Sequence, residues 1–409
     1  MKRGKIVTFK RFGWALCSGM FLLTTAAHAA EDAALAHARR LLQSAILVDG
    51  HNDLPWAIRE NKTAPGDVKA YDLRKPTPGN TDLARLRLGG VGAQFWSVYI
   101  PGELDGGFAR TQLEQIDIAR RIIAQYPDRL QFATSVADIR AAHKAGKIAS
   151  LMGMEGGHAI EDSLGALRAY YDLGVRYMTL THNVNLSWAD SQAKPPEHGG
   201  LTPFGEQVVL EMNKLGMLVD LSHTSDGTMD DALRVSKAPV IFSHSSARAL
   251  CNVARNVPDE ILRRLKANGG VVMVTFVAGF IDPAVAAVQV PAMAEINKRA
   301  LGKSIEERER IEAEVLGKLK VPPTSIAKVA DHIEHIRDVA GVEHVGIGGD
   351  FDGNSEWPEG LSDVSMYPNL FAELIHRGWS DRDLKLLAGE NVLRAMEQAE
   401  AVSRRLSKE

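Results

Sequence analysis

Short apolar segments recur along the chain, and most of them end in polar or glycine-rich residues. Several are continuous apolar runs instead of alternating polar and apolar positions, and those at 217–221 and 270–276 are the clearest. Continuous runs of this length are typical of strands buried on both faces of a parallel sheet. The pattern predicts eight strands, at 45–49, 91–100, 148–154, 175–181, 217–221, 239–242, 270–276 and 344–347.

Amphipathic stretches lie between the predicted strands, for example at 112–125 and 163–173. Strands that alternate with helices in this way predict an α/β protein with a (β/α)₈ TIM barrel. A doubly wound open sheet is the main alternative, but the first strand lacks the glycine-rich turn that a dinucleotide-binding sheet of that kind uses.

The interval between the last two predicted strands is too long for one connection. Its charged residues with helical spacing predict a helical insertion, a surface helix or a lid, around 281–325.

The N-terminus has the three parts of a secretory signal peptide. Five basic residues lie within the first eleven positions, an apolar run follows at 14–23, and Ala27-His28-Ala29 offers a cleavage site. We therefore expect residues 1–29 to be removed and residues 30–409 to form a single barrel domain that is exported, either to the periplasm or outside the cell. The apolar run is too short to span a bilayer and no second run approaches that length, so no stable membrane insertion is expected after cleavage.

Composition and charge narrow the class of function. The 409 residues are 45% hydrophobic and 24% charged, which is ordinary for a globular protein. A formal net charge of −3 without a basic stripe argues against nucleic-acid binding. Of the two cysteines only Cys251 follows the predicted leader, so the mature chain can form no internal disulfide.

Histidine and acidic residues fall at the ends of six of the eight predicted strands, where TIM barrels build their active sites. Side chains two positions apart on a strand point to the same side, so His51 and Asp53 can share one metal ion. Imidazole and carboxylate together suit zinc or a similar divalent ion. Five candidate ligands exceed the number that one open catalytic zinc uses. The sequence therefore predicts two ions with a bridging carboxylate and a shared, nucleophilic hydroxide.

Longer motifs surround these positions. They are Asp-Gly-His-Asn-Asp-Leu-Pro-Trp at 49–56, Gly-Met-Glu-Gly-Gly-His at 153–158, Leu-Thr-His-Asn at 180–183, Asp-Leu-Ser-His at 220–223, Phe-Ser-His-Ser-Ser-Ala at 242–247, Arg-Asn-Val-Pro-Asp at 255–259 and Gly-Gly-Asp-Phe-Asp-Gly at 348–353. In this order the motifs resemble the renal-type membrane dipeptidases, the M19 family of zinc metallopeptidases. With the leader, the chain resembles a secreted bacterial member.

The resemblance implies a barrel of the metal-dependent hydrolase type with two zinc ions, bridged by Glu155. It places His51 and Asp53 on one ion, and His223 and His244 on the other. The implied reaction is hydrolysis of dipeptides, including those with a C-terminal D-residue, by a hydroxide that bridges the metals. Members of the family are often dimeric, so a homodimer is a further expectation.

The resemblance also implies two catalytic residues and a carboxylate anchor. His182 would lie beside the scissile carbonyl, contact the substrate and stabilise its developing oxyanion. Asp350 would also contact the substrate, take a proton from the bridging water and give one to the leaving amine; the residues alone do not separate it from Asp352. Arg255 would bind the C-terminal carboxylate of the substrate. Phe280 stands where mammalian members have a tyrosine.

Two alternatives remain open. The first is another binuclear barrel hydrolase acting on a lactone, a β-lactam or another amide. Many such proteins bridge their metals with a modified lysine on the fourth strand, whereas the strand here ends Thr181-His182 and Glu155 is offered by the strand before it. The second alternative is a non-catalytic exported protein that binds metal or solute, which would not need Asp350.

Overall fold

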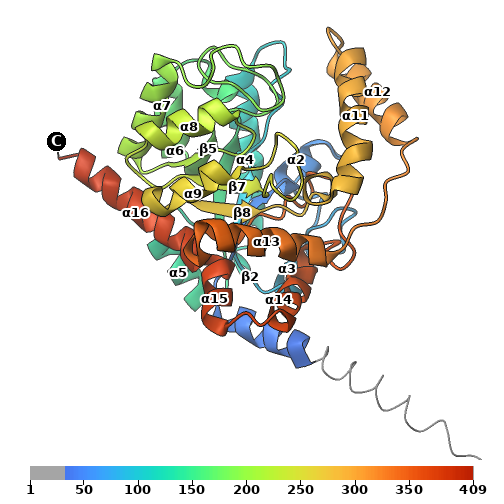
Figure 1. Ribbon diagram of the computed structural model, residues 1–409, viewed down its shortest axis with the longest axis vertical. Coiled ribbons are helices and arrows are strands. Elements are labelled where there is room, and N and C mark those ends of the chain that lie inside the picture. Colours follow the sequence, from blue (N-terminus) through green and yellow to red (C-terminus); the bar gives the residue numbers. More distant parts are fainter. Residues whose placement is uncertain (1–32, 409) are drawn as a thin grey trace, which may run out of the picture.

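The computed structural model describes residues 33–408, without the side chains of residues 305, 306 and 309. The predicted leader at 1–29 lies outside the described residues. Within them, no helix is both long and apolar enough to cross a bilayer. The described chain starts as a helix that leads directly into the first strand of the barrel (Figure 1).

Eight parallel strands close into a barrel, which confirms the predicted fold. In the order β2-β1-β9-β8-β7-β6-β5-β4 each strand pairs with the next, and a pairing between β2 and β4 closes the ring. Every predicted strand has its counterpart, because each is buried on both faces and therefore continuously apolar. The strands are β1 (Leu47–Asn52), β2 (Val91–Ser97), β4 (Ile148–Glu155), β5 (Val175–Thr179), β6 (Leu218–Asp220), β7 (Ile241–Ser245), β8 (Val271–Val274) and β9 (Val345–Ile347).

One further strand, β3 (Leu130–Phe132), was not predicted. It pairs with the first residues of β4, at Ile148–Ser150, and β5 pairs with the later ones from Met152 onward. A strand of three residues is too short to show a hydrophobic period, so only tertiary pairing reveals it.

Helices surround the barrel (Figure 1). Their apolar faces pack on the outer faces of the strands in one large buried cluster. The helices are α2 (Leu54–Arg59), α3 (Leu83–Leu88), α4 (Phe108–Gln125), α5 (Val136–Lys144), α6 (Leu164–Asp172), α7 (Pro203–Leu215), α8 (Asp226–Val235), α9 (Asp259–Asn268), α10 (Ala278–Ile281), α11 (Pro283–Arg299), α12 (Ile305–Leu316), α13 (Ile326–Ala340), α14 (Tyr367–His376), α15 (Asp381–Lys385) and α16 (Asn391–Leu406).

The inside of the barrel holds a second apolar cluster, which includes Phe95, Tyr177 and Met273 and continues onto α5 and α16. Gly153 on β4 makes room for it, because a Cβ at this position would collide with the Tyr177 ring. Towards the carboxyl ends of the strands the buried residues become polar. The apolar filling therefore forms a floor beneath a polar mouth.

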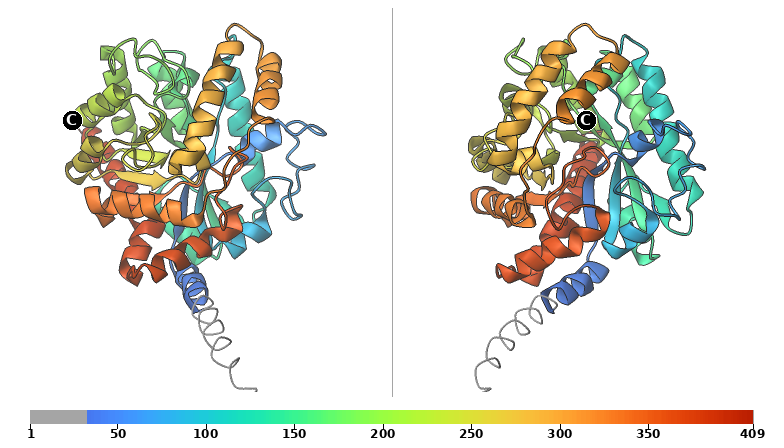
Figure 2. Two further views of the ribbon diagram at one scale, coloured as in Figure 1. Left: turned by 45° about the vertical axis from the view of Figure 1, so that its right-hand side comes forward. Right: turned by 90° about the vertical axis from the view of Figure 1, so that its right-hand side faces the viewer.

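The connection between β8 and β9 holds the α-helices α10 to α13. Two of them, α11 and α12, form a hairpin that stands away from the barrel (Figures 1 and 2). The hairpin has a small core of its own, in which Ala292 and Ile296 of α11 meet Val315 of α12. At its base Thr324 Oγ1 donates a hydrogen bond to Asp282 Oδ2, at 2.9 Å. This contact joins the segment that enters the hairpin to the segment that leaves it.

Candidate metal centre

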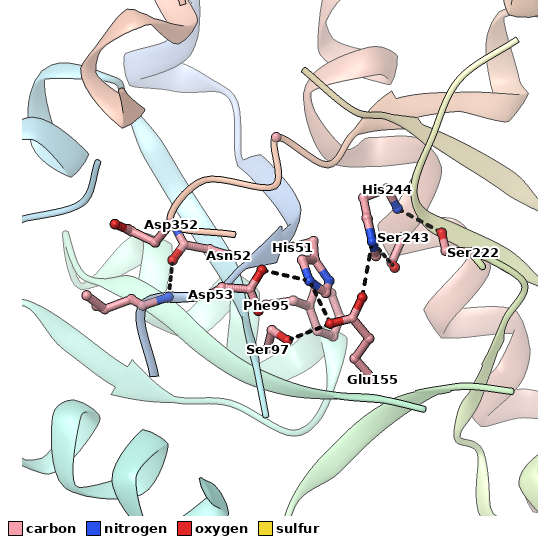
Figure 3. A network of polar contacts seen from close by, with 12 residues as sticks. His51, Asn52, Asp53, Phe95, Ser97, Glu155, Ser222, Ser243, His244 and Asp352 are labelled. Atoms are coloured by element: carbon pink, nitrogen blue, oxygen red, sulfur yellow. Dashed lines mark hydrogen bonds and ion pairs between the residues drawn. The ribbon is translucent and has the colours of Figure 1, made fainter. Parts of the chain in front are cut away.

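The histidine and acidic residues singled out in the sequence converge at the carboxyl ends of the strands. Figure 3 shows four of them pointing toward one another: His51, Asp53, Glu155 and His244. Three overlapping groups have ligand atoms close enough to hold a metal ion, each with all atoms within 4.8 Å of one another. The groups are His51 with Glu155 and His244, Glu155 with His182 and His223, and His51 with Asp53 and Asp350.

Glu155, the last residue of β4, lies at the centre of this arrangement. Its Oε1 is 3.1 Å from His223 Nε2 and 3.3 Å from His244 Nε2. Its Oε2 is 3.4 Å from His51 Nε2, on the other side of the carboxylate. Each oxygen thus faces a different set of ligands, which is the geometry a carboxylate needs to bridge two ions.

The tautomer of His244 follows from its neighbours. Ser243 Oγ donates its proton to Asp220 Oδ2 at 2.6 Å, so it accepts the hydrogen bond from His244 Nδ1 at 2.8 Å. The proton therefore sits on Nδ1, and the lone pair of Nε2 points into the site. Ser243 and Asp220 lie in the sequence motifs, but only their contacts show that they orient this ring.

His223 presents its Nε2 in the same way. Its Nδ1 lies 3.3 Å from Asn183 Oδ1, a carbonyl oxygen that can only accept a hydrogen bond. Burial lowers the pKa of both His223 and His244 well below the usual value, and nearby cations, Arg255 among them, lower it further. Two neutral rings therefore point their lone pairs at each other across 3.0 Å.

This arrangement calls for a cation. Two imidazole lone pairs and a carboxylate oxygen, all within 3.0–3.3 Å of one another, repel unless a positive charge lies between them. Ligand atoms at about 2.0–2.1 Å from a tetrahedral zinc ion are separated by about 3.3 Å. The donor set and its spacing therefore fit a divalent metal ion.

His51 faces carboxylates on the other side of Glu155. Its Nε2 lies 3.3 Å from Asp53 Oδ2, while Nδ1 contacts the Tyr177 hydroxyl at 2.9 Å. Burial disfavours the charged ring, but the Tyr177 hydroxyl, Glu155 and Asp53 together raise its pKa well above the usual value. The Nε2 position thus attracts a proton or a metal ion. Asp53 Oδ1 is buried and has no hydrogen-bond partner in the described part of the chain.

A buried network of hydrogen bonds around Asp49 fixes the strand that carries His51. Asp49 accepts hydrogen bonds from the Tyr367 hydroxyl at 2.7 Å, from Gly349 N at 2.8 Å and from Gln94 Nε2 at 3.0 Å. It thereby ties β1 to β2 and to the segment after β9. The sequence indicated no role for Tyr177, Tyr367 or Gln94, because none of them lies in a motif.

The structure separates Asp350 from Asp352. Asp350 lies close to His51 and Asp53. Burial raises the pKa of Asp350 well above the usual range, the charge of His51 opposes this rise, and the charges of Asp53 and Glu155 add to it. Asp352 instead accepts a hydrogen bond from Asn80 N at 2.7 Å, and burial raises its pKa to about 6. Asp350 therefore belongs to the centre, and Asp352 holds the segment around residue 80.

Backbone strain accompanies the site. His223 and Asp350 have φ of 64° and 66°, in the left-handed region that residues with a Cβ rarely occupy. Each such residue costs about 1–3 kcal/mol. The two turns follow β6 and β9. The first brings His223 close to Glu155, and the second brings Asp350 close to His51 and Asp53.

Arg255, on the loop after β7, is only 3% exposed. Its Nη1 donates to Ser245 Oγ at 2.7 Å, and its guanidinium carbon lies 5.4 Å from the centre of the Phe280 ring. Its Nε and Nη2 are buried and have no hydrogen-bond partner among the described residues. Burial lowers its pKa to about 10, so it stays charged at neutral pH. Two unsatisfied donors on a buried cation are suited to a carboxylate ligand.

His182 lies at the rim of the centre. Its Nε2 is 3.9 Å from Glu155 Oε1, and its ring is 4.3 Å from that of His223. Burial lowers its pKa well below the usual value, and neighbouring cations add to the effect, so the ring is neutral. Its side chain is 12% exposed, so it can be reached from the mouth of the barrel.

Residues 35–409 match the family model described as membrane dipeptidase, peptidase family M19. The chain belongs to this family. It is also 44% identical to mouse dipeptidase 3 over 368 residues. The matched region covers 88% of this chain and 66% of that relative, slightly under two thirds of the relative's length.

Solved structures show the same fold. A probable dipeptidase from Pseudomonas aeruginosa, PvdM, matches with a TM-score of 0.79 and 26% identity, over 91% of this chain and 99% of the other. A second, described as dipeptidase AC of family M19, matches with a TM-score of 0.71 and 25% identity, over 87% of this chain and 98% of the other.

The first prediction concerns the central carboxylate. Glu155→Gln keeps the size of the side chain but removes the charge that faces both sets of ligands, so the variant should bind less metal than wild type. Metal analysis by mass spectrometry after dialysis measures this. Asp352→Asn is the matched control, because Asp352 is a buried acid outside the centre, and it should keep its metal. A Glu155→Gln variant that retains as much metal as wild type would show that the Glu155 charge is not needed to hold it.

Proposed function

We propose that this chain is an exported, zinc-dependent dipeptidase that hydrolyses the peptide bond of dipeptides. The observation that carries the proposal is the position of Arg255, a buried cation with two free donors beside a metal centre of the membrane dipeptidase family. A metal centre can act on any amide that reaches it. A cation at a fixed distance from it selects substrates whose carboxylate lies one residue beyond the scissile bond.

The metal ligands in this proposal follow the geometry of the centre. His51 and Asp53 would hold one zinc ion, His223 and His244 would hold the other, and Glu155, which lies between the two pairs, would contact both. When bound, such a pair supplies a water of lowered pKa and polarises the substrate carbonyl. The mixed imidazole and carboxylate donors favour zinc over calcium or magnesium, which prefer oxygen ligands alone.

Asp350 moves the proton in this proposal. Burial raises the pKa of its carboxyl group well above the usual range, which makes it a stronger proton acceptor than an ordinary aspartate. As the carboxylate it takes a proton from the attacking water. As the acid it gives that proton to the nitrogen of the leaving amine when the peptide bond breaks.

His182 stabilises the carbonyl oxygen as it becomes negative. Because the ring is neutral, one of its two nitrogens carries a proton, and this N–H can donate a hydrogen bond to the carbonyl oxygen. Its Nε2 lies 3.9 Å from Glu155 Oε1, and its partly exposed ring is within reach of a substrate carbonyl that enters the centre. Dipeptides with a C-terminal D-residue are included in the proposal, because Arg255 reads the carboxylate and not the side chain beside it.

Export is part of the proposal, and the positive leader, apolar run and Ala27-His28-Ala29 support it. N-terminal sequencing of protein collected outside the cytoplasm should begin at Ala30. A chain found only in the cytoplasm with its leader intact would rule out export without affecting the activity.

The second prediction tests the substrate class. Purified protein loaded with zinc should hydrolyse free dipeptides, and amidation of their C-terminus should lower kcat/KM by about 10- to 100-fold, because a charged hydrogen bond contributes about 1.5–3 kcal/mol. Arg255→Ala should lose activity on free dipeptides and lose little more on amidated ones. Arg263→Ala, an exposed arginine on α9, is the control and should behave as wild type.

Two results would contradict these assignments. If wild type and Arg255→Ala discriminate equally between free and amidated dipeptides, Arg255 is not the carboxylate anchor. If zinc-loaded protein cleaves a lactone or a β-lactam but no dipeptide, the chain is another binuclear hydrolase. Bound zinc without any hydrolysis would indicate a binding protein.

The third prediction concerns Asp350. Asp350→Asn removes the proton carrier and keeps the size of the side chain, so kcat should fall by about 10²–10⁴-fold while both metal ions remain bound. Steady-state kinetics and metal analysis on the same preparation give the two values. The matched Asp352→Asn variant should retain far more activity. A metal-replete Asp350→Asn enzyme with near-normal kcat would exclude Asp350 as the proton carrier.

A further inference from the structure

Two buried serines lie directly beside two histidines of the metal centre. Ser222 precedes His223 in the chain, Ser245 follows His244, and both serine side chains are fully buried. Their hydroxyl oxygens are 3.2 Å apart, so one hydroxyl donates a hydrogen bond to the other. Ser222 Oγ also accepts a hydrogen bond from His244 N at 3.1 Å, a contact drawn in Figure 3. The pair therefore joins the segment after β6 to the last residue of β7.

The same pair holds Arg255. Ser245 Oγ accepts the hydrogen bond from Arg255 Nη1 at 2.7 Å, and the guanidinium carbon lies 5.4 Å from the centre of the Phe280 ring. Asn256 Nδ2 donates to Phe280 O at 2.7 Å, which ties the loop of the ring to the loop of the arginine. The guanidinium is thus held between a hydroxyl group and an aromatic ring, and its Nε and Nη2 have no partner among the described residues.

An arginine needs such a partner to bind a carboxylate at one defined place. Its side chain is long and has many rotamers, and its planar fork matches a carboxylate only when both the plane and the distance are right. Ser245 is the last residue of β7 and adjoins His244. One short stretch of a rigid strand therefore sets the distance between the guanidinium and the metal ligands.

A dipeptide presents its carboxylate at an equally defined distance. With an α-amino acid at the C-terminus, the carboxylate carbon is two bonds from the nitrogen of the peptide bond. β-Alanine inserts one more carbon and moves the carboxylate by about 1.5 Å. A misplacement of about 1 Å can lower the rate of an enzymatic reaction by about 100-fold. An anchor that is fixed relative to the metal centre therefore distinguishes the two kinds of dipeptide.

We infer that Ser245 is a positioning residue, which fixes the reach of Arg255 from the metal centre and so gives a preference for dipeptides with a C-terminal α-amino acid. The inference rests on the proposed function and adds a limit on its substrate class. Ser245 acts through Arg255 and does not itself contact the substrate. Without its hydroxyl group the guanidinium keeps its charge but can follow a carboxylate to either distance.

The test compares L-Ala-L-Ala with L-Ala-β-Ala, an isomer of the same charge. Zinc-loaded wild type should have a kcat/KM about tenfold higher on L-Ala-L-Ala. Ser245→Ala should lower kcat/KM on L-Ala-L-Ala by about tenfold and bring the ratio of the two values close to one, while the amount of bound metal stays that of wild type. Ser246→Ala is the matched control and should keep the ratio. It also removes a fully buried serine hydroxyl, but one without a hydrogen-bond partner in the described part of the chain.

A double variant separates positioning from general damage to the site. Ser245→Ala added to Arg255→Ala should not change the ratio any further, because no guanidinium is left to position. A variant damaged only in its packing would lose kcat/KM on both dipeptides by the same factor and would keep the ratio of wild type.

Several results would overturn the inference. They are an unchanged ratio in metal-replete Ser245→Ala, an equal loss of preference in Ser246→Ala, and a further change of the ratio when Ser245→Ala is added to Arg255→Ala. Loss of metal from Ser245→Ala would show that the serine supports the ligands and not the anchor. If wild type cleaves both dipeptides equally well, Ser245 sets no reach, while the dipeptidase function stands. Failure of wild type to cleave any dipeptide would instead overturn the proposed function itself.

Discussion

The structure depends on one electrostatic constraint: a buried carboxylate and the ring nitrogens of three histidines point into the same small space. Glu155 faces His223 and His244 with one oxygen and His51 with the other. Moving a carboxylate out of water costs several kcal/mol unless a positive charge compensates it. The rings of His223 and His244 cannot supply that charge to the oxygen they face, because burial has lowered the pKa of both. His51, whose pKa is raised, faces the other carboxylate oxygen. Divalent ions can supply the charge, so folding of the mouth and metal binding are coupled.

The barrel makes this arrangement rigid. Tyr177 and Ser243 contact the outward nitrogens of His51 and His244, and Asp49 ties β1 to the segment after β9. These contacts determine which ring nitrogen faces the centre, as partners outside the ligand set commonly do in metal sites. The apolar floor around Phe95 and Met273 supports the ligands from beneath. The strained turns at His223 and Asp350 persist because the surrounding structure overdetermines them.

Much of the fold could be predicted from the sequence, because strands buried on both faces are continuously apolar and helices have their own period. The short strand β3 could not, since it exists only through pairing with β4. At the site, His51 and Asp53 could be paired from their spacing alone. Tyr177 could not, because it lies outside every motif and meets His51 only through the closure of the barrel. The difference between Asp350 and Asp352 likewise depends on which loop each one contacts.

The most direct test of the coupling between the buried carboxylate and the metal ions is a crystal structure with anomalous diffraction recorded on both sides of the zinc absorption edge. The account predicts two anomalous peaks, about 3.5–4 Å apart, one on each side of the Glu155 carboxylate. One peak should contact His51 and Asp53, and the other His223 and His244. A single peak, or peaks that do not contact Glu155 in crystals grown with excess zinc, would contradict the account.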